Sequence, residues 1–513
     1  MIPQSSQPLR SHPLLTVTDF LNFRTCAGYA WLARHRPHHV PDQSDPTSRR
    51  REAADAEVRD LVHRATPDLV FVEAADPEES ALETAILIES GASAIAGATA
   101  LSARGLLGVA DLLVRTDRGW ELVVVHASSS IKSEHAVEAA FQQRAFIEAG
   151  IELAGIRLVH LRKTYRRGPE LDLAELLVSV DIAARVIRVG AQVARDIDVA
   201  LAILGDESRP AICRCDLGTR NMRCPTFEHF HPGISGGDTV YDLGGISGRK
   251  LEDVLARGIH RLVDWPDDIE ISARQRQQIK AVRTGREHVD IDAIRDFLDR
   301  LRYPLHFLDY ETFQLAVPAF EGCLPWSQIP FQYSIHQLQA DGRLEHREFL
   351  STTPMHLPVS DLIAHLRRDI GPEGSVIVWN QGFEQSRNRD MAEILPEATG
   401  FLEDVSARMV DLMDVVRDGF WVHPAFNGSA SIKKVLPVAA PSLSYDQLEI
   451  GEGMLAAEQW VQAVMRDPAV MDERERAGIF AALREYCERD TLAMVLVLDY
   501  LRQVVDSQVL ALR

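Results

Sequence analysis

The segment LHFLDYETF, from Leu305 to Phe313, decides how the second half of the chain is interpreted. Its apolar residues predict a buried strand, and Asp309 and Glu311 stand two positions apart in it. Because residues i and i+2 of a strand point to the same face, the two carboxylates share one face. A central strand would bury them without compensation unless they bind a cation. The alternative is an edge strand with its acids in solvent, but the apolar flanks favour a metal site.

An α/β pattern surrounds this strand. Two further strands are predicted at FQYSIHQLQ (331–339) and REFLS (347–351), with a turn at 340–342 between them. The helix PVSDLIAHLRRDI (358–370) and the strand SVIVWN (375–380) follow, and mainly helices are predicted after that. The pattern predicts an α/β domain over residues 301–513.

Two more motifs carry acids in this half. Asn380 and Glu384 fall at a strand-to-helix turn, where functional side chains are common, although Glu384 alone would be interpreted as a solvated helix residue. Tyr486 and Asp490, in REYCERDTLAMVLVLDYL, stand four apart and so share one face of a helix. Each motif is weak alone and gains weight from the order of all three.

Together the three motifs resemble those of the DEDD exonucleases, which have a DnaQ-type, RNase H-like fold. That family carries Asp-x-Glu on the first strand, Asn-x-x-Phe-Asp after a later strand and Tyr-x-x-x-Asp on a late helix. Glu384 stands where most members have Asp, which keeps the charge and lengthens the side chain by one methylene. The matching residues here are Asp309, Glu311, Asn380, Phe383, Glu384, Tyr486 and Asp490.

The resemblance implies a two-metal 3′→5′ exonuclease that acts on nucleic acid. Hard carboxylate oxygens suit two Mg²⁺ or Mn²⁺ ions, and Tyr486 would orient or deprotonate the attacking water. The residues implied as metal ligands are Asp309, Glu311, Glu384 and Asp490.

Two longer segments extend the resemblance. PAFEGCLPWSQIPFQYSIH (318–336) and HPAFNGSASIKKVLP (423–437) resemble an uncharacterised bacterial family of the DUF2779 type, which joins a RecB-like part to a DnaQ-like part. Nucleic-acid contacts are expected from Asn380, from Phe331 and Tyr333 by base stacking, and from Lys433 and Lys434 at phosphates. Core aromatics and a solvated charge pair are the alternatives, and Asp411 is predicted to be a plain helix residue.

The first 235 residues also read as α/β. LLGVADLLVR (106–115) and WELVVVHAS (120–128) flank a turn and predict a hairpin. They resemble the PD-(D/E)XK fold of RecB-like nucleases, in which one strand carries Asp and the next Glu-x-Lys. The positions that match this site are Asp111, Val124 and His126, with Glu57 on the preceding helix and Gln142 on the following one.

This N-terminal site is expected to be degenerate. Val124 cannot replace the metal-binding Glu, and a neutral His126 cannot supply the fixed charge of Lys. The domain is therefore interpreted as a nuclease fold that has lost catalysis and still binds DNA or a partner. An α/β core that was never a nuclease is the alternative.

The cysteines suggest a second cofactor in residues 1–235. Members of these families hold an iron–sulfur cluster with one N-terminal and three late cysteines, which Cys26, Cys215 and Cys224 match, while Phe230 occupies the last position. Cys213 is the substitute ligand. Zinc completed by His229 or His231, and a loop of free thiols over 213–231, are the alternatives. Cys323 and Cys487 are predicted to be packing residues.

Composition sets the limits. The chain has 513 residues and a net charge of −20, which argues against a broadly cationic nucleic-acid coat. No segment reaches the length of a membrane helix and no signal peptide is recognised, so a cytoplasmic protein is expected. We expect three parts: a domain over 1–235, a helical connector over 236–300 and a domain over 301–513. The expected function is a nuclease of DNA repair or anti-phage defence. DNA is favoured over RNA as the substrate, and protein partners of such a system are also expected. A catalytically weak scaffold and an unrelated phosphohydrolase are the alternatives.

Overall fold

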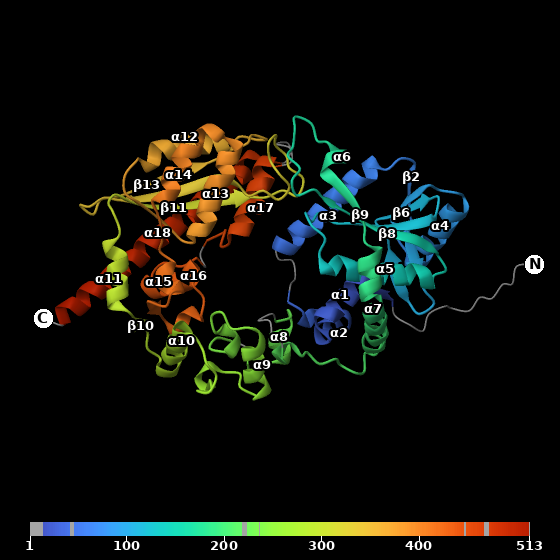
Figure 1. Ribbon diagram of the computed structural model, residues 1–513, viewed down its shortest axis with the longest axis horizontal. Helices are drawn as coiled ribbons and strands as arrows, with labels where there is room; N and C mark the ends of the chain where they lie inside the picture. Colours follow the sequence, from blue (N-terminus) through green and yellow to red (C-terminus); the bar gives the residue numbers. More distant parts are fainter. Residues whose placement is uncertain are drawn as a thin grey trace, which may run out of the picture. The chain divides into compact units, whose positions relative to one another are not determined.

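The computed structural model describes residues 14–41, 46–217, 223–234, 236–445, 448–465 and 471–511. It divides into two compact units, each labelled by its elements in Figure 1. Unit 1 contains the described residues up to 233 together with Ala316–Trp326. Unit 2 contains the described residues from 234 to 315 and from 327 onward. The mixed α/β class is confirmed in both units.

Unit 1 is built on a six-stranded mixed sheet. The predicted hairpin is confirmed, since β6 and β7 pair antiparallel with Thr116 opposite Gly119. The run 106–115 is not one strand, because it bends at Ala110 and Asp111 and its first part joins a second sheet of order β1-β5-β4. The large sheet has the order β2 (Leu69–Phe71), β3 (Ala94–Ala96), β6 (Leu112–Thr116), β7 (Gly119–Val125), β8 (Leu153–Leu161) and β9 (Leu177–Asp181); the small one contains β1 (Leu15–Thr16), β4 (Thr99–Leu101) and β5 (Leu106–Val109).

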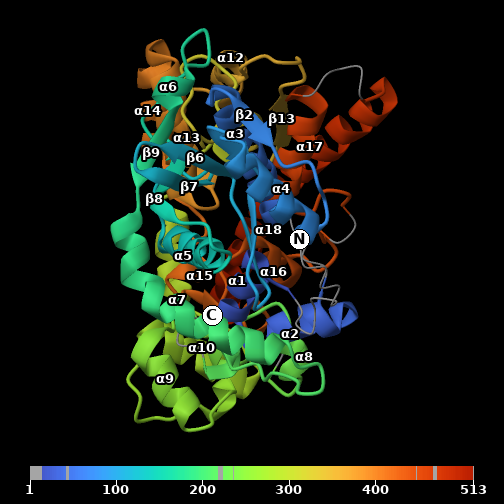
Figure 2. The same ribbon diagram turned by 90° about the vertical axis from the view of Figure 1, so that its right-hand side faces the viewer.

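Helices cover these sheets. The N-terminal helical patch is two helices, α1 (Val17–Thr25) and α2 (Ala27–His35), which are separated at Cys26. Helices α5 (Ser133–Glu148) and α7 (Ala183–Leu204) lie side by side in Figures 1 and 2 and contribute Phe141, Phe146 and Ile197 to the apolar core. The remaining helices are α3 (Pro46–Ala65), α4 (Pro77–Glu89), α6 (Leu173–Leu176) and α8 (Phe227–Phe230).

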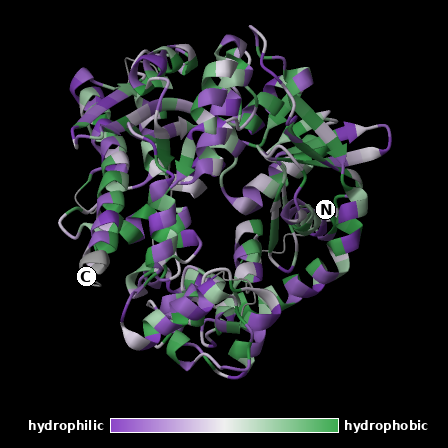
Figure 3. Cartoon of the chain, turned by 60° about the vertical axis from the view of Figure 1, so that its left-hand side comes forward, coloured by the Kyte–Doolittle hydropathy of each residue, from purple (hydrophilic) through white to green (hydrophobic). Residues whose placement is uncertain are grey.

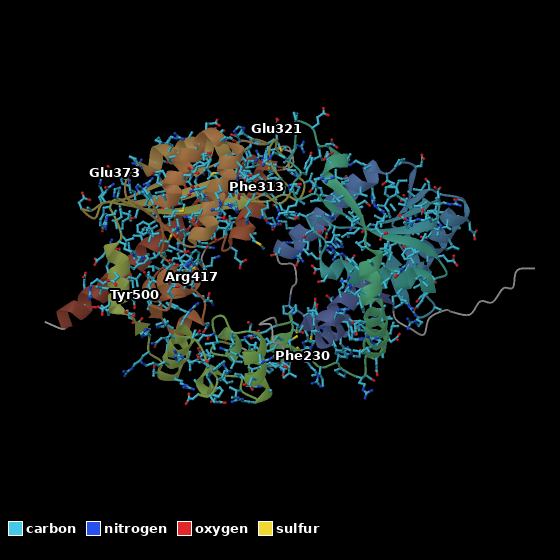
Figure 4. All side chains as sticks on the ribbon, in the orientation of Figure 1. Phe230, Phe313, Glu321, Glu373, Arg417 and Tyr500 are labelled. Carbon is cyan, nitrogen blue, oxygen red and sulfur yellow. The ribbon has the colours of Figure 1, made fainter. Side chains whose placement is uncertain are left out.

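Unit 2 is built on a five-stranded sheet in which the first strand, β11, is central. Strands β13, β12 and β11 pair antiparallel, and β14 and β15 continue parallel to β11. The end of β11, Phe313 (labelled in Figure 4), stacks on Trp460 with ring centroids 4.6 Å apart. The strands are β11 (Leu305–Phe313), β12 (Ile329–Leu338), β13 (Leu344–Leu350), β14 (Ser375–Val378) and β15 (Met409–Asp411); β10 (His288–Val289) and β16 (Trp421–Val422) form a separate pair.

The region 236–300, predicted as a connector, belongs to unit 2. It contains α9 (Gly248–Ala256), α10 (Ala273–Thr284) and α11 (Ile291–Asp299). In Figure 3 the strands are mostly hydrophobic in colour, whereas the helices alternate between hydrophilic and hydrophobic residues, as expected for helices with one buried face. The other helices are α12 (Val359–Ile370), α13 (Gln381–Ile394), α14 (Thr399–Ala407), α15 (Asp414–Arg417), α16 (Ile432–Ala439), α17 (Gly453–Met465) and α18 (Glu473–Ala511). Within the described ranges, no helix combines the length and the apolar character needed to cross a membrane.

Candidate metal centre

Strand β11 presents an apolar half and an acidic half on the same face. Leu305 and Phe307 join an apolar cluster with Met494 and Leu498 of α18. Asp309 and Glu311 continue that face by the period of two of a strand. The apolar half thus fixes the strand against α18 and places its acids beside the preceding turns of that helix.

The acidic half meets a cysteine. One carboxylate oxygen each of Asp309 and Glu311 and the Sγ of Cys487 all lie within 4.8 Å of one another. Cys487, on α18, is fully buried, and its thiol donates to Oδ2 of Asp309 across a long 3.9 Å. These three side chains are brought together by one strand and one helix.

Burial close to one another raises the pKa of the carboxyl groups at this site. Burial raises the pKa of Asp309 well above its ordinary value, and the charge of Asp490 raises it further. Burial raises the pKa of Glu311 and Glu384 in the same way, with the charge of Asp309 adding to both. Glu384 is 2% exposed, and its Oε2 has no hydrogen-bond partner in the described part of the chain. A bound cation would offset the free-energy cost of burying these acids close together.

Asp490 is approached by two tyrosines. Tyr445 donates its hydroxyl to Oδ1 of Asp490 at 2.5 Å. Burial raises the pKa of Asp490 to about 6, against the opposing hydrogen bonds from Tyr445 and Tyr486 and the charge of Lys433. The sequence predicted Tyr486 but missed Tyr445, because a loop residue 45 positions away carries no periodic signal that links it to Asp490.

Lys433 lies at this site and not in a solvated charge pair. Its ammonium donates to the carbonyl of Gly451 at 2.6 Å and stands 5.6 Å from the ring centroids of both Tyr445 and Tyr486. Lys434 is exposed. One lysine of the predicted pair therefore belongs to the acidic site, and the other points to solvent.

Base stacking by two aromatic residues is contradicted. Phe331 and Tyr333 are both 0% exposed. Phe331 stacks on Trp460 with centroids 4.7 Å apart, and the Tyr333 hydroxyl donates to Asp369 at 2.7 Å. Both are core residues because β12 is covered on both faces. This was the alternative interpretation of the two aromatic side chains.

Two polar residues organise the turn between β14 and α13. Asn380 is exposed and adopts a left-handed backbone with φ 86°, so its side chain is free to meet a ligand. Asp411 is the last residue of β15 and not a helix residue as predicted. Its buried carboxylate accepts the backbone N–H groups of Asn380 and Gln381, at 3.0 and 3.1 Å, and so caps α13. Asp411 therefore positions the helix that carries Glu384.

Unit 1 surrounds its own acids with cations. Oδ1 of Asp111 accepts from Arg59, and Oδ2 accepts from the backbone N–H of Val125 at 2.7 Å. His126 stands 3.0 Å from Glu138 and 3.8 Å from Asp55. Burial alone would lower the pKa of His126, but hydrogen bonds to Asp55 and Glu138 and their charges raise it to about 10.

Two N-terminal predictions, those for His126 and Glu57, are corrected by these contacts. His126 is an imidazolium at neutral pH and does supply a fixed positive charge, contrary to the expectation of a neutral ring. Glu57 is exposed, and Asp55 is the acid that α3 directs at the site. Gln142 bonds both backbone groups of Val109, at 2.9 and 3.0 Å, so it has a structural role. Val124 is buried in the apolar core.

The four cysteines converge. The Sγ atoms of Cys26, Cys213, Cys215 and Cys224 all lie within 4.8 Å of one another, and Cys213 and Cys224 are 3.5 Å apart. Hydrogen bonds, above all with Cys26, lower the pKa of Cys224. Among the described residues, neither His229 nor His231 joins this group.

Glycine 28 lets α2 approach this cluster. A Cβ there would lie 2.7 Å from the backbone nitrogen of Cys213 and 2.9 Å from the ring of Phe230, which is labelled in Figure 4. The aromatic ring at the position where the resemblance expects a cysteine thus packs against α2. Cys213 contributes the fourth sulfur of the group.

Residues 306–431 match a protein family described as a domain of unknown function, DUF2779. The matched region contains Asp309, Glu311 and Glu384 and ends before Tyr486 and Asp490. No solved structure matches the chain.

Three curated relatives share part of the chain. The uncharacterized protein MG366 of Mycoplasma genitalium is 27% identical over 226 residues, which is 40% of this chain and 33% of that protein. Its homolog in Mycoplasma pneumoniae is 26% identical over 220 residues, 39% of this chain and 32% of the homolog. The uncharacterized protein UU173 of Ureaplasma parvum is 27% identical over 234 residues, 41% of this chain and 33% of that protein. The chain therefore matches only about a third of the length of these relatives.

Proposed function

We propose that unit 2 is a metal-dependent nuclease, a 3′→5′ exonuclease with DNA favoured over RNA as the substrate. The observation that carries this proposal is the set of buried, mutually repelling carboxylates around β11, one of them with an unpartnered oxygen. Several acids held together in a protein interior are unfavourable unless a cation binds them. The resemblance to the DEDD motifs supplies the substrate class and the polarity.

Asp309 and Glu311 lie close enough to share one ion, and the resemblance to the DEDD motifs adds Glu384 and Asp490 for a second. Asp309, Glu311, Glu384 and Asp490 would hold them, and bound ions would generate the attacking hydroxide and stabilise the leaving oxygen. Tyr486 would orient the water. Tyr445 holds the carboxylate of Asp490 through its 2.5 Å hydrogen bond, and Lys433 places a positive charge beside Glu311 and Asp490.

The same proposal extends to the folds. A central acidic strand with an antiparallel pair on one side and a parallel pair on the other supports an RNase H-like unit 2. The β6–β7 hairpin with Asp111 before it and His126 after it supports a PD-(D/E)XK-like unit 1. Because its acids are paired with Arg59 and His126, we assign unit 1 a binding role in place of catalysis. The proposed setting is cytoplasmic DNA repair or anti-phage defence.

The test is a cleavage assay with strands labelled at the 5′ end, offered as single-stranded and duplex DNA and RNA with Mg²⁺, Mn²⁺ or EDTA. Stepwise shortening from the 3′ end in metal, and none in EDTA, is expected. Asp309→Asn and Asp490→Asn should each lower the rate about 10³-fold or more, because each weakens the hold on a metal ion. If the folded double variant still cleaves at the wild-type rate, unit 2 is not the nuclease.

A structural metal at the cysteine cluster is a separate proposal. Four sulfurs that bind one tetrahedral ion at about 2.3 Å stand roughly 3.8 Å apart, which suits four atoms that all lie within 4.8 Å. In a [4Fe–4S] cluster each thiolate binds a different iron, and in a [2Fe–2S] cluster the thiolates are divided between two irons, so either cluster spreads the sulfurs further. The spacing favours one zinc ion. Metal analysis of anaerobically purified protein decides: zinc in a colourless protein supports this assignment, and iron with visible charge-transfer absorbance supports the cluster.

A further inference from the structure

The cysteine beside the acids differs from the other buried cysteine outside the quartet. Cys487 Sγ lies within 4.8 Å of both Asp309 and Glu311, whereas Cys323 belongs to neither potential metal-binding group among the described residues. Asp490, three positions later in α18, shares the face of Cys487. The thiol therefore lies beside Asp309 and Glu311 and on the helix face that carries Asp490.

Packing alone does not explain a thiol at this position. Its hydrogen bond to Asp309 is 3.9 Å long, and a thiol is a weak donor. Burial raises the pKa of Cys487 well above its ordinary value, and the surrounding carboxylates raise it further. Without a cation, the thiol offers the carboxylates only a weak hydrogen bond. Burial and mutual repulsion also oppose the ionisation of the thiol and the acids at the same time.

We propose that Cys487 is the third protein ligand of the ion held by Asp309 and Glu311, and that this position selects a borderline divalent ion of the Zn²⁺ class over Mg²⁺. The inference rests on the proposed metal site of unit 2. Thiolate ligands favour softer ions, whereas Mg²⁺ prefers oxygen and retains its waters. A mixed set of two carboxylates and one thiolate matches the ions between these extremes.

The spacing agrees with such an ion. With metal–sulfur and metal–oxygen bonds of about 2.3 and 2.1 Å at a tetrahedral angle, sulfur and oxygen stand roughly 3.6 Å apart. The Sγ of Cys487 and Oδ2 of Asp309 are 3.9 Å apart. A shift of a few tenths of an ångström, which side-chain torsions absorb, would complete the set.

The first experiment uses Co²⁺ as a coloured stand-in for Zn²⁺ on the full chain. A Cys487→Ala variant is compared with the wild type and with the matched control Cys323→Ala. The four-cysteine cluster contributes equally to all three spectra. The wild type minus Cys487→Ala difference should contain a thiolate-to-cobalt charge-transfer band, and the Cys323→Ala difference should contain none. Equal spectra for wild type and Cys487→Ala overturn the inference.

The second experiment measures the concentration of Cd²⁺ that is needed to displace bound Mn²⁺. The displacement of Mn²⁺ is monitored by electron paramagnetic resonance. Mn²⁺ prefers oxygen ligands, so its signal reports the acidic site and not the cysteine cluster. Displacement from Cys487→Ala should need about 10–100-fold more Cd²⁺, as loss of a metal-supporting residue commonly costs, while Mn²⁺ affinity changes little. Cys487→Ser, which retains a small polar side chain, is the second variant if the alanine protein does not fold. If a folded variant needs no more Cd²⁺ than the wild type to release Mn²⁺, the inference is also overturned.

Asp309→Ala separates this inference from the function on which it rests. If it abolishes Mn²⁺ binding while Cys487→Ala leaves the cobalt spectrum unchanged, the metal site stands and only the cysteine ligand is wrong. If Mn²⁺ binds Asp309→Ala as it binds the wild type, the metal site itself is wrong, and the ligand role of Cys487 is overturned with it.

Discussion

Both units bury carboxylates near a central strand, but they compensate the negative charge to different degrees. In unit 1, Arg59 bonds Asp111, and the imidazolium of His126 stands between Asp55 and Glu138. In unit 2, Asp309 and Glu311 face Asp490 and a neutral thiol, and Lys433 is the nearby cation that lowers the pKa of Glu311 and Asp490. In unit 1, side chains of the protein itself supply the positive charges beside the acids. The arrangement in unit 2 becomes favourable when a metal ion binds.

The pKa directions of Asp55 and Asp309 express the same difference. Burial would raise the pKa of Asp55, but hydrogen bonds from His126 and Ala127 and the charge of His126 lower it. Burial and neighbouring acids raise the pKa of Asp309 and Glu384 together. An acidic motif in a sequence therefore indicates a metal site only when the fold leaves its charge uncompensated.

The largest expected effect on stability is at His126. His126→Ala should lower the free energy of unfolding by about 3 kcal/mol at pH 7, because it leaves the partly buried Asp55 and Glu138 without their shared cation. The pKa of His126 is raised, so this stabilisation is full below about pH 6.5 and is lost as pH rises through about 10. Denaturant unfolding of both proteins at several pH values measures it. Equal stability at neutral pH would contradict a charged pair.

Metal affinity should depend on pH in unit 2. The pKa of Asp490 is about 6, and the pKa values of Asp309 and Glu311 are raised well above their ordinary values, so protons compete with a metal ion for these acids. Mn²⁺ affinity should therefore fall by about tenfold or more for each pH unit below 6, since each displaced proton contributes a factor of ten. Titrations from pH 5 to 8 measure it, with Asp111→Asn as the control that should show the same curve.

Removing an acid should change stability in opposite directions in the two units. Asp490→Asn should raise the metal-free stability by about 1–3 kcal/mol above pH 6, because the pKa shift from 3.8 to about 6 costs the folded state when the acid is ionised. The gain should vanish below about pH 4, where the acid is protonated in both states. Asp55→Asn should instead destabilise. Thermal unfolding in EDTA tests both, and a loss at Asp490 would reverse the comparison.

The smallest expected effect is at Asp111. Asp111→Asn should leave cleavage by the full chain within about twofold of wild type, because Arg59 and the Val125 backbone already satisfy this carboxylate. The cleavage assay measures it alongside Asp309→Asn. If both changes reduce cleavage equally in folded proteins, unit 1 is catalytic with a different ligand set.

The periodic parts of the fold and site were predictable from sequence. The predicted strand Leu305–Phe313 has the bounds of β11, and its period of two places Asp309 and Glu311 on one face. The four-residue spacing likewise places Tyr486 and Asp490 on one face of α18. Local pattern decides such features, so no knowledge of distant contacts is needed.

Features set by tertiary partners were not predictable. The charge of His126 depends on two acids brought from α3 and α5, and Tyr445 reaches Asp490 from a loop. The prediction that Glu57 faces the site was wrong, and Asp55 faces it instead. Two positions along a helix correspond to a rotation of about 200°, so the two residues lie on nearly opposite faces. Burial of Phe331 depends on Trp460 of α17, more than a hundred residues away.

The segment Ala316–Trp326 bears on how this chain can be divided for expression. It follows β11 of unit 2, yet it belongs to unit 1, where Ala316 and Val317 are buried and the Trp326 indole donates to the carbonyl of Ala127 at 2.6 Å. Within the described ranges, the polypeptide thus passes from one unit to the other after 233, 315 and 326. A truncated clone that begins at 236 or 301 would carry this apolar insert without its partners, directly beside the acidic strand. Replacing the insert with a short polar linker is therefore the rational design for producing unit 2 alone.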